Sequence, residues 1–177
     1  MEIQERITKV SLKDYSSLRV GGEAEYLETS TMAELVEVLM YAKKEGKRVH
    51  ILGSGTNTYF GENLENLFVV KICMKGISCE DFEESVLLTA YAGEIWDNLV
   101  HFSTNQNLWG IENLSYIPGT VGAAPVQNIG AYGAELKDVF VSLSALDRDT
   151  LDVVAIDRDA CDFGYRDSLF KHEAGKY

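Results

Sequence analysis

An uncharged stretch of small residues, Tyr116 to Gly133, constrains the fold of this 177-residue chain most strongly. It holds four glycines and three alanines, whereas surface loops are usually more polar and core helices carry larger apolar residues. Glycine allows positive φ and close approach by a ligand, and clustered backbone N–H groups bind anions such as a diphosphate. The amides of Gln127 and Asn128 suit the edge of a heteroaromatic ring. The stretch therefore predicts either a tight buried crossover or a ligand cradle.

Composition and charge exclude several classes of partner. The hydrophobic fraction of 46% and the charged fraction of 25% are typical of a globular protein. A net charge of −12 disfavours nucleic acid and anionic membranes as partners. Because no apolar run reaches membrane-spanning length and no signal peptide opens the chain, we expect a cytoplasmic protein without a membrane partner. Three irregularly spaced cysteines and three scattered histidines predict reduced thiols and no metal site.

The hydrophobic pattern predicts a mixture of strands and helices. We expect a first strand within residues 1–22, a short buried strand at 49–52, further strands at 24–28, 67–72 and 85–92, and a hairpin formed by 139–145 and 153–155. A helix is expected from Thr31, in a capping box with Glu34, to Gly46, with an apolar stripe of Leu35, Val38, Leu39 and Ala42. A second helix is expected over 94–105. The apolar stripe of the second helix should be Ile95, Leu99, Val100 and Phe102. We also expect Trp96 and Trp109 in the core and a solvated turn at residues 80–84.

Two further polar clusters accompany the small-residue stretch. Gly53–Asn57 follows a predicted strand and is a second candidate anion cradle, although it lacks the third glycine of the dinucleotide fingerprint and the Gly-Lys end of a P-loop. A plain turn remains the alternative. The segment 163–168 contributes Arg166, a residue type suited to gripping a carboxylate and stabilising negative charge. A structural ion pair of Arg166 with Asp167 is the alternative there. Taken together, the three clusters predict a ligand site.

Four segments carry a family resemblance: 51–57, 110–114, 117–133 and 161–171. With these motifs in this order and spacing, the chain resembles the UDP-N-acetylenolpyruvoylglucosamine reductases, also called UDP-N-acetylmuramate dehydrogenases, flavoenzymes of peptidoglycan precursor synthesis. The resemblance implies an α+β, two-lobed FAD-binding domain of the vanillyl-alcohol-oxidase/PCMH type. Residues 1–70 would form the first lobe and residues 71–177 the second, with FAD between them.

The resemblance also implies a site and a reaction. FAD would be bound non-covalently, NADPH would be the hydride donor, and the enolpyruvyl double bond of the UDP-sugar would be reduced. Arg166 would be catalytic, by stabilising negative charge on the substrate carboxylate, and Tyr132 and Arg166 would contact the substrate. The cofactor-binding residues would be Gly53, Ser54, Gly55, Thr56, Asn57, Pro118, Gly119, Thr120, Gly122, Ala123, Gln127, Asn128 and Gly130.

The chain departs from the family pattern by stopping at Tyr177. The family's substrate domain, its proton-donating serine and a late glutamate would follow this point. We therefore expect the FAD-binding part of the enzyme, inactive by itself in an assay of substrate-dependent NADPH oxidation. Exposed sheet edges near residues 139–156 predict self-association. Two alternatives remain: a non-catalytic flavin- or nucleotide-binding module, and a structural or interaction domain with an empty cleft.

Overall fold

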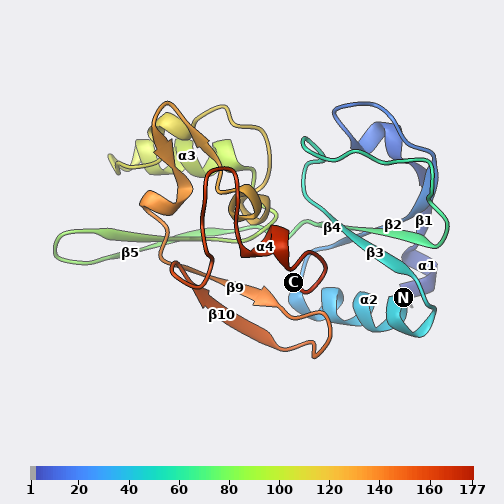
Figure 1. The fold of residues 1–177 in the computed structure, drawn as a ribbon. Coiled ribbons are helices and arrows are strands. Elements are labelled where there is room, and N and C mark those ends of the chain that lie inside the picture. Colours follow the sequence, from blue (N-terminus) through green and yellow to red (C-terminus); the bar gives the residue numbers. More distant parts are fainter. Residues whose placement is uncertain (1–2) are drawn as a thin grey trace. The chain divides into compact units, whose positions relative to one another are not determined.

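The computed structural model describes residues 3–177 and consists of two compact units (Figure 1). The division falls between Lys75 and Gly76, where the sequence predicted a boundary after residue 70. Each unit has its own strands and its own hydrophobic core. The two units are therefore described separately.

The first unit is built on a four-stranded sheet in the order β1-β2-β4-β3. Strand β1 is antiparallel to β2, whereas β2, β4 and β3 run parallel. The central strand β4 is β-branched and aromatic, and its Phe68, Val69 and Val70 are fully buried. The elements are α1 (Ile3–Arg6), β1 (Thr8–Ser11), the 3-10 helix η1 (Leu12–Tyr15), β2 (Glu23–Thr29), α2 (Met32–Lys44), β3 (Arg48–Leu52) and β4 (Leu67–Ile72).

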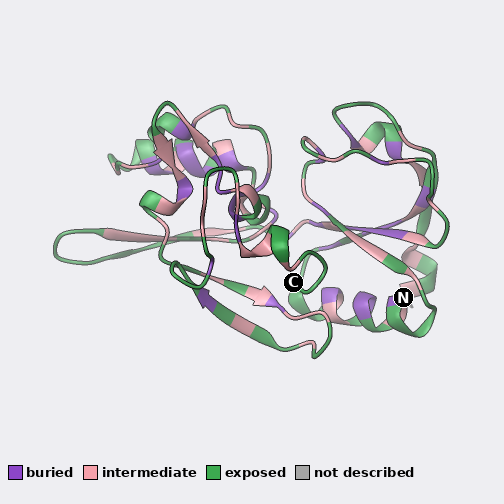
Figure 2. Cartoon of the chain, in the orientation of Figure 1, coloured by how far each residue is buried: buried purple, intermediate pink, exposed green. Residues whose placement is uncertain are grey.

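Both faces of this sheet are covered, because successive residues of a strand point to opposite sides. Phe68 faces α2, where the ring of Tyr41 lies 6.2 Å away in an edge-on arrangement. Val69 faces the other side and belongs to a core cluster that includes Leu12 and Phe60. Figure 2 shows the buried positions along α2 and the neighbouring strands. The predicted stripe of α2 is confirmed, since all four of its members are buried: Leu35, Val38, Leu39 and Ala42.

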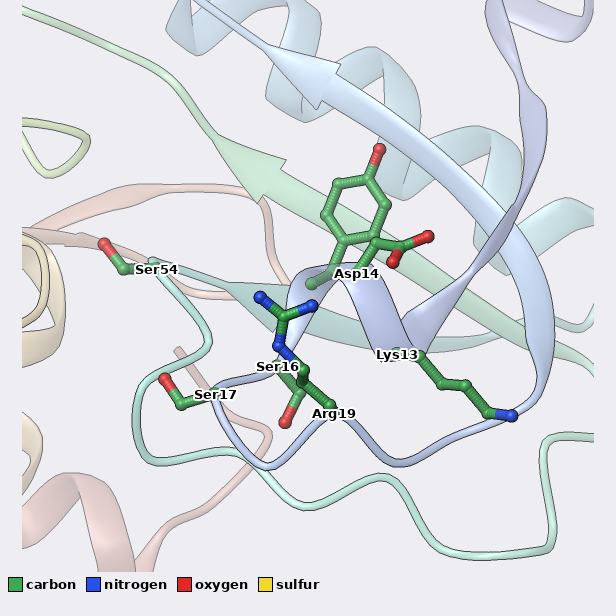
Figure 3. Close-up of a pocket in the computed structure, with 7 residues that line it drawn as sticks. Lys13, Asp14, Ser16, Ser17, Arg19 and Ser54 are labelled. Atoms are coloured by element: carbon green, nitrogen blue, oxygen red, sulfur yellow. The ribbon is translucent and has the colours of Figure 1, made fainter.

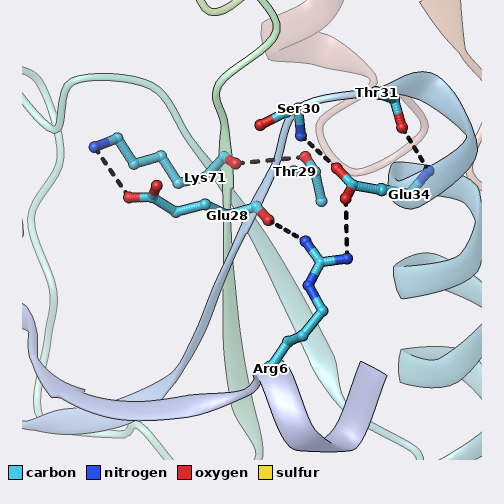
Figure 4. Close-up of polar contacts among 7 residues, drawn as sticks. All are labelled: Arg6, Glu28, Thr29, Ser30, Thr31, Glu34 and Lys71. Atoms are coloured by element: carbon cyan, nitrogen blue, oxygen red, sulfur yellow. Dashed lines mark hydrogen bonds and ion pairs between the residues drawn. The ribbon is translucent and has the colours of Figure 1, made fainter. Parts of the chain in front are cut away.

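A polar network fixes the start of α2 (Figure 4). The Thr31 hydroxyl accepts a hydrogen bond from the Glu34 N–H at 3.2 Å, as an N-cap should. The Glu34 carboxylate accepts from the Ser30 N–H at 2.7 Å and pairs with Arg6 at 3.0 Å. These donors hold the pKa of Glu34 below its usual value, the Ser30 N–H being the main cause. The Thr31 half of the predicted capping box is thus confirmed, whereas the Glu34 carboxylate bonds the N–H of Ser30, one residue before the N-cap.

The second unit carries three antiparallel strand pairs and several short helical turns. Its largest helix, α3 (Trp96–Asn105), packs on a core drawn from loops as much as from regular elements. The core residues are Trp96, Leu99, Val100, Ile111, Leu114, Ala124, Ile129 and Leu136. The remaining elements are β5 (Ile77–Asp81), β6 (Val86–Ala90), η2 (Glu112–Leu114), η3 (Val121–Gln127), β7 (Gly130–Ala131), β8 (Ala134–Glu135), η4 (Leu136–Asp138), β9 (Ser142–Leu146), β10 (Val153–Asp157) and α4 (Leu169–His172).

Several predictions about side-chain burial are wrong. Trp109 was expected in the core but is 88% exposed, whereas Trp96 is 2% exposed and donates its indole N–H to the Leu114 carbonyl. Ile95 precedes the helix and is exposed, so Trp96 takes its expected place in the stripe. Strand β3, expected to be buried, lies at the sheet edge, and only its Leu52 is buried.

Two strand assignments also need correction. Residues 80 and 81 were expected in a solvated turn but belong to β5, a strand that the sequence analysis missed because its residues are mostly polar. The β9–β10 hairpin is confirmed, but Val139 and Val141 lie before β9. In β10, the predicted inward residues Val153 and Ala155 are exposed, whereas Val154 is half-buried and Ile156 is buried. Among residues 3–177, no helix is long and apolar enough to cross a bilayer.

Candidate functional site

A glycine turn follows strand β3 at the carboxyl end of the parallel strands. Gly53 comes directly after Leu52, the last residue of β3, and β2 and β4 end nearby in register with it. In α/β sheets, ligands bind beyond the carboxyl ends of the strands, where loops diverge. The predicted cradle over residues 53–57 therefore lies at the edge of the sheet where a ligand site is expected.

Gly55 is held against the backbone of an earlier segment. Its φ is +68°, and a Cβ at this position would lie 1.9 Å from the Tyr15 carbonyl oxygen. The Gly55 carbonyl accepts a hydrogen bond from the Ser17 N–H at 3.1 Å. The buried Ser16 hydroxyl donates to the Thr58 carbonyl at 2.8 Å. Residues 15–17 therefore clamp the turn and fix its conformation, and only glycine fits at position 55.

The clamped turn contains backbone donors that are not used within the described part of the chain. Within residues 3–177, no hydrogen-bond acceptor is found for the N–H groups of Gly53, Ser54 and Gly55. Since backbone donors are almost always paired inside a folded protein, three consecutive donors without acceptors are suited to an anion. The prediction of an anion cradle at this turn is thus consistent with the geometry. Thr56 and Asn57 complete the turn and have contacts within the protein.

A polar pocket of about 570 Å³ opens beside this turn (Figure 3). Its walls come from η1, from the segment after it and from Ser54. The lining residues are Lys13, Asp14, Tyr15, Ser16, Ser17, Arg19 and Ser54. No role was predicted for residues 13–19, although the run Arg19-Val20-Gly21-Gly22 at the end of this segment was a signal that could have been used.

The small-residue stretch 117–133 uses its backbone donors differently. The N–H groups of Val121 and Gly122 donate to the carbonyls of Glu94 and Ala92, and those of Ala123 and Ala124 both donate to the Thr120 carbonyl. A Cβ at Gly122 would lie 2.6 Å from that of Ala92, so glycine here permits close packing. The structure therefore favours the crossover interpretation for this part of the stretch.

The outer surface of the same stretch remains available to a ligand. Pro118, Gly122 and Ala123 are exposed, and Gln127 is half-buried. Three other predicted cofactor residues take part in the packing of the fold. The Gly119 carbonyl accepts a hydrogen bond from the Trp96 N–H, and Thr120 is buried. Gly130 pairs with Glu135 in the β7–β8 hairpin. The predicted cofactor residues of this stretch thus divide into packing positions and surface positions.

Tyr132 occupies the tip of the β7–β8 hairpin. Its φ is +53° and that of Gly133 is +82°, the pair of positive values that a type I′ turn requires. Its side chain is 91% exposed. A bulky residue at such a position carries backbone strain, which is common at ligand-contacting sites. This placement is compatible with the predicted substrate contact.

Asn128 and Ser168 join the stretch 117–133 to the Arg166 segment. The Asn128 side chain is fully buried, and its amide donates to the Gly164 carbonyl at 2.9 Å and accepts from the Lys137 N–H at 3.0 Å. The buried Ser168 hydroxyl donates to the Val126 carbonyl at 2.7 Å. Asn128 was predicted to contact the cofactor, but both ends of its amide are bound within the protein, so its role in the structure is to position these loops.

Arg166 lies in a tight turn closed by two hydrogen bonds between Gly164 and Asp167. Its φ is +52°, and Lys171 donates to its carbonyl at 2.5 Å. The alternative ion pair with Asp167 is not formed, because the Asp167 carboxylate pairs with His172 at 2.8 Å. That contact is the main cause of a lowered pKa for Asp167. No partner for the Arg166 guanidinium is found in the described part of the chain, which leaves it available to an anion.

A family model described as an FAD binding domain matches residues 24–151. The chain therefore belongs to this family of FAD-binding domains. The expected α+β fold of the vanillyl-alcohol-oxidase/PCMH type is confirmed. A cholesterol oxidase from Brevibacterium sterolicum has the same fold, with a TM-score of 0.66 at 15% identity, covering 85% of this chain and 32% of that one.

Relatives of known name support the resemblance stated from the sequence. The chain is 45% identical over 179 residues to the UDP-N-acetylenolpyruvoylglucosamine reductase of Pseudomonas aeruginosa, covering 100% of this chain and 52% of the relative. The crystal structure of the corresponding reductase from Thermus caldophilus is similar, with a TM-score of 0.70 at 27% identity over 92% of this chain and 56% of that one. The resemblance is thus confirmed, and the chain spans about half the length of the curated relatives it matches.

The hydrogen bonds of the Asn128 side chain to Gly164 and Lys137 predict a loss of stability when they are removed. Replacing Asn128 by Ala leaves the Gly164 carbonyl and the Lys137 N–H without their partner, at a cost of about 2–3 kcal/mol in the free energy of unfolding. Denaturant unfolding of both proteins measures the difference. The matched control is Asn113→Ala, which removes an exposed amide and should change stability by less than about 0.5 kcal/mol. Equal stabilities for the two variants would contradict the assigned role.

Proposed function

We propose that this chain binds FAD non-covalently and forms the flavin-binding part of an NADPH-dependent reductase that converts UDP-N-acetylenolpyruvoylglucosamine to UDP-N-acetylmuramate. The observation that carries the proposal is the run of N–H groups without acceptors at Gly53, Ser54 and Gly55, in a chain that matches an FAD-binding domain. The diphosphate of FAD is the part of the cofactor that these donors would bind. Peptidoglycan precursor synthesis and a cytoplasmic location follow from the same proposal.

The residues of this chain would contribute binding and electrostatic stabilisation. Bound FAD supplies hydride transfer between NADPH and the enolpyruvyl double bond. Arg166 would bind the substrate carboxylate and stabilise the negative charge that develops on it, as its unpaired guanidinium allows. Tyr132 would contact the substrate from the hairpin tip. Ser168 has no part in proton transfer, because its buried hydroxyl is committed to the Val126 carbonyl.

The flavin proposal predicts the effect of a single added charge at the turn. Ser54→Asp places a carboxylate on the exposed side of the cradle, and repulsion of the diphosphate should weaken FAD binding about ten- to hundredfold. Flavin fluorescence quenching measures the dissociation constant. Ser85→Asp adds the same charge at an exposed turn of the other unit and should leave the affinity unchanged. A wild-type chain that binds no FAD would overturn the proposal.

The role of Arg166 predicts a loss of turnover without a loss of flavin. In the complete gene product that contains this sequence, Arg166→Gln should lower substrate-dependent NADPH oxidation about a hundred- to a thousandfold, because a positioned donor to developing charge is removed. The FAD dissociation constant should not change. Arg158→Gln, at another exposed arginine of the same unit, is the control and should retain activity. Full activity of the Arg166 variant would refute the assignment.

We also propose self-association through the β9–β10 pair. Among the described residues these two strands pair only with each other, and Val141 and Val153 are exposed beside them. Open edges with exposed apolar residues favour pairing with a second copy. Sedimentation velocity should show a species larger than the monomer at high concentration, and Val153→Lys should shift it toward the monomer. A monomer at every concentration would count against this proposal.

A further inference from the structure

A carboxylate directly follows Arg166, on the residue Asp167. The two residues share one tight turn, in which Gly164 and Asp167 exchange two backbone hydrogen bonds. Opposite charges within about 4 Å of each other attract even in water, so a carboxylate at this place tends to pair with the guanidinium. Such a pair would occupy the donors that a substrate carboxylate needs. Arg166 can therefore bind a ligand freely only if the Asp167 carboxylate is held elsewhere.

The short helix α4 contacts both residues with basic side chains (Figure 1). The Lys171 ammonium donates to the Arg166 carbonyl at 2.5 Å. The Nε2 atom of the His172 imidazole lies 2.8 Å from the Oδ2 atom of Asp167. Lys171 thus holds the backbone that carries the guanidinium, and His172 holds the neighbouring carboxylate.

The charges around Asp167 agree with this arrangement. The hydrogen bond to His172 is the main cause of the lowered pKa of Asp167, and the Ser168 N–H and the Lys171 ammonium lower this pKa further. Among residues 3–177, Arg166 has no carboxylate partner, although its side chain is exposed. The ionised Asp167 carboxylate is therefore engaged by α4 and by the backbone, and not by the adjacent guanidinium.

We infer that His172 is a positioning residue, which holds the Asp167 carboxylate away from Arg166 and so keeps the guanidinium free for the carboxylate of the substrate. This role of His172 rests on the function proposed above for Arg166. His172 acts through Asp167 and needs no contact with the substrate. If the imidazole only stiffened the turn, its loss would misplace Arg166 and would not depend on the charge of Asp167.

The kinetic test uses the complete gene product that contains this sequence. His172→Ala releases Asp167 to compete for Arg166, so the KM for UDP-N-acetylenolpyruvoylglucosamine should rise about two- to fivefold, the range of one exposed ion pair. The value of kcat should stay within about twofold, because the bound substrate still meets the same guanidinium. In the double variant His172→Ala/Asp167→Asn no carboxylate competes, and KM should return to the wild-type value. A misplaced turn would instead lower kcat, and Asp167→Asn would not restore it.

The chain offers a matched control in a second histidine–aspartate pair. On helix α3 of the same unit, His101 lies 3.4 Å from the Asp97 carboxylate. The two histidine side chains are equally exposed, 63% for His101 and 64% for His172, but no arginine adjoins Asp97 in the sequence. His101→Ala should therefore leave KM unchanged. An unchanged KM in His172→Ala, or a raised KM that persists in the double variant, would overturn the role of His172.

A second measurement needs neither flavin nor substrate. Carboxyl-carbon NMR follows the titration of Asp167 in this chain. In His172→Ala, Arg166 should replace the imidazole and keep the pKa of Asp167 below its ordinary value, and adding Arg166→Gln should raise it. Arg166→Gln alone should leave this pKa unchanged, because His172 is still in place.

The titration also separates the role of His172 from the proposed function. Equal pKa values of Asp167 in His172→Ala and in His172→Ala/Arg166→Gln would show that the released carboxylate does not reach Arg166, and would overturn the inference. A complete gene product without substrate-dependent NADPH oxidation would refute the reductase function. The titration of Asp167 would then decide by itself whether His172 keeps this carboxylate from Arg166.

Discussion

The close contact between Gly55 and the Tyr15 carbonyl fixes the turn that follows β3 in the first unit. Because glycine has no Cβ, the turn after β3 can lie directly on the segment 15–17. Hydrogen bonds from the Ser16 hydroxyl and the Ser17 N–H hold the two segments together. The carbonyls of Gly55 and Thr58 make this attachment, and the N–H groups of Gly53, Ser54 and Gly55 have no acceptor among residues 3–177. Donors left over in this way at the carboxyl end of a parallel sheet are what the proposed anion site requires.

The two glycine-rich segments look alike in sequence but use their N–H groups differently. In 53–55 the N–H groups have no acceptor among residues 3–177, whereas in 121–124 they donate to the carbonyls of Ala92, Glu94 and Thr120. Glycine permits both outcomes, since it allows a strained backbone and it allows close packing. An anion cradle differs from a buried crossover in whether its N–H groups have acceptors within the protein. Those acceptors lie on segments distant in sequence, so the sequence of the stretch itself does not reveal them.

The sequence was a good guide where the pattern is local. The stripe of α2 and its Thr31 cap follow from residue spacing, strand β4 follows from its β-branched residues, and all three are confirmed. It failed where tertiary context decides, as with Trp109, which sits after α3 on an exposed turn, and with β5, whose polar residues pair with β6 without a buried face. For the site, motif residues could be named in advance, but the pairing of Gly55 with Tyr15 and the buried role of Asn128 required the fold.

Under the proposed function, a turn in each unit presents polar groups to a ligand. A polar group that binds a ligand cannot also stabilise its own turn, so the stabilising contacts have to come from other atoms. Ser16 and Gly55 provide them for the turn at 53–55, and Asn128 and Ser168 provide them for the turn that carries Arg166. These buried hydrogen bonds stabilise the two turns. Tyr132 and Arg166 have positive φ values, and the substrate contacts proposed for their exposed side chains would explain why this backbone strain is tolerated.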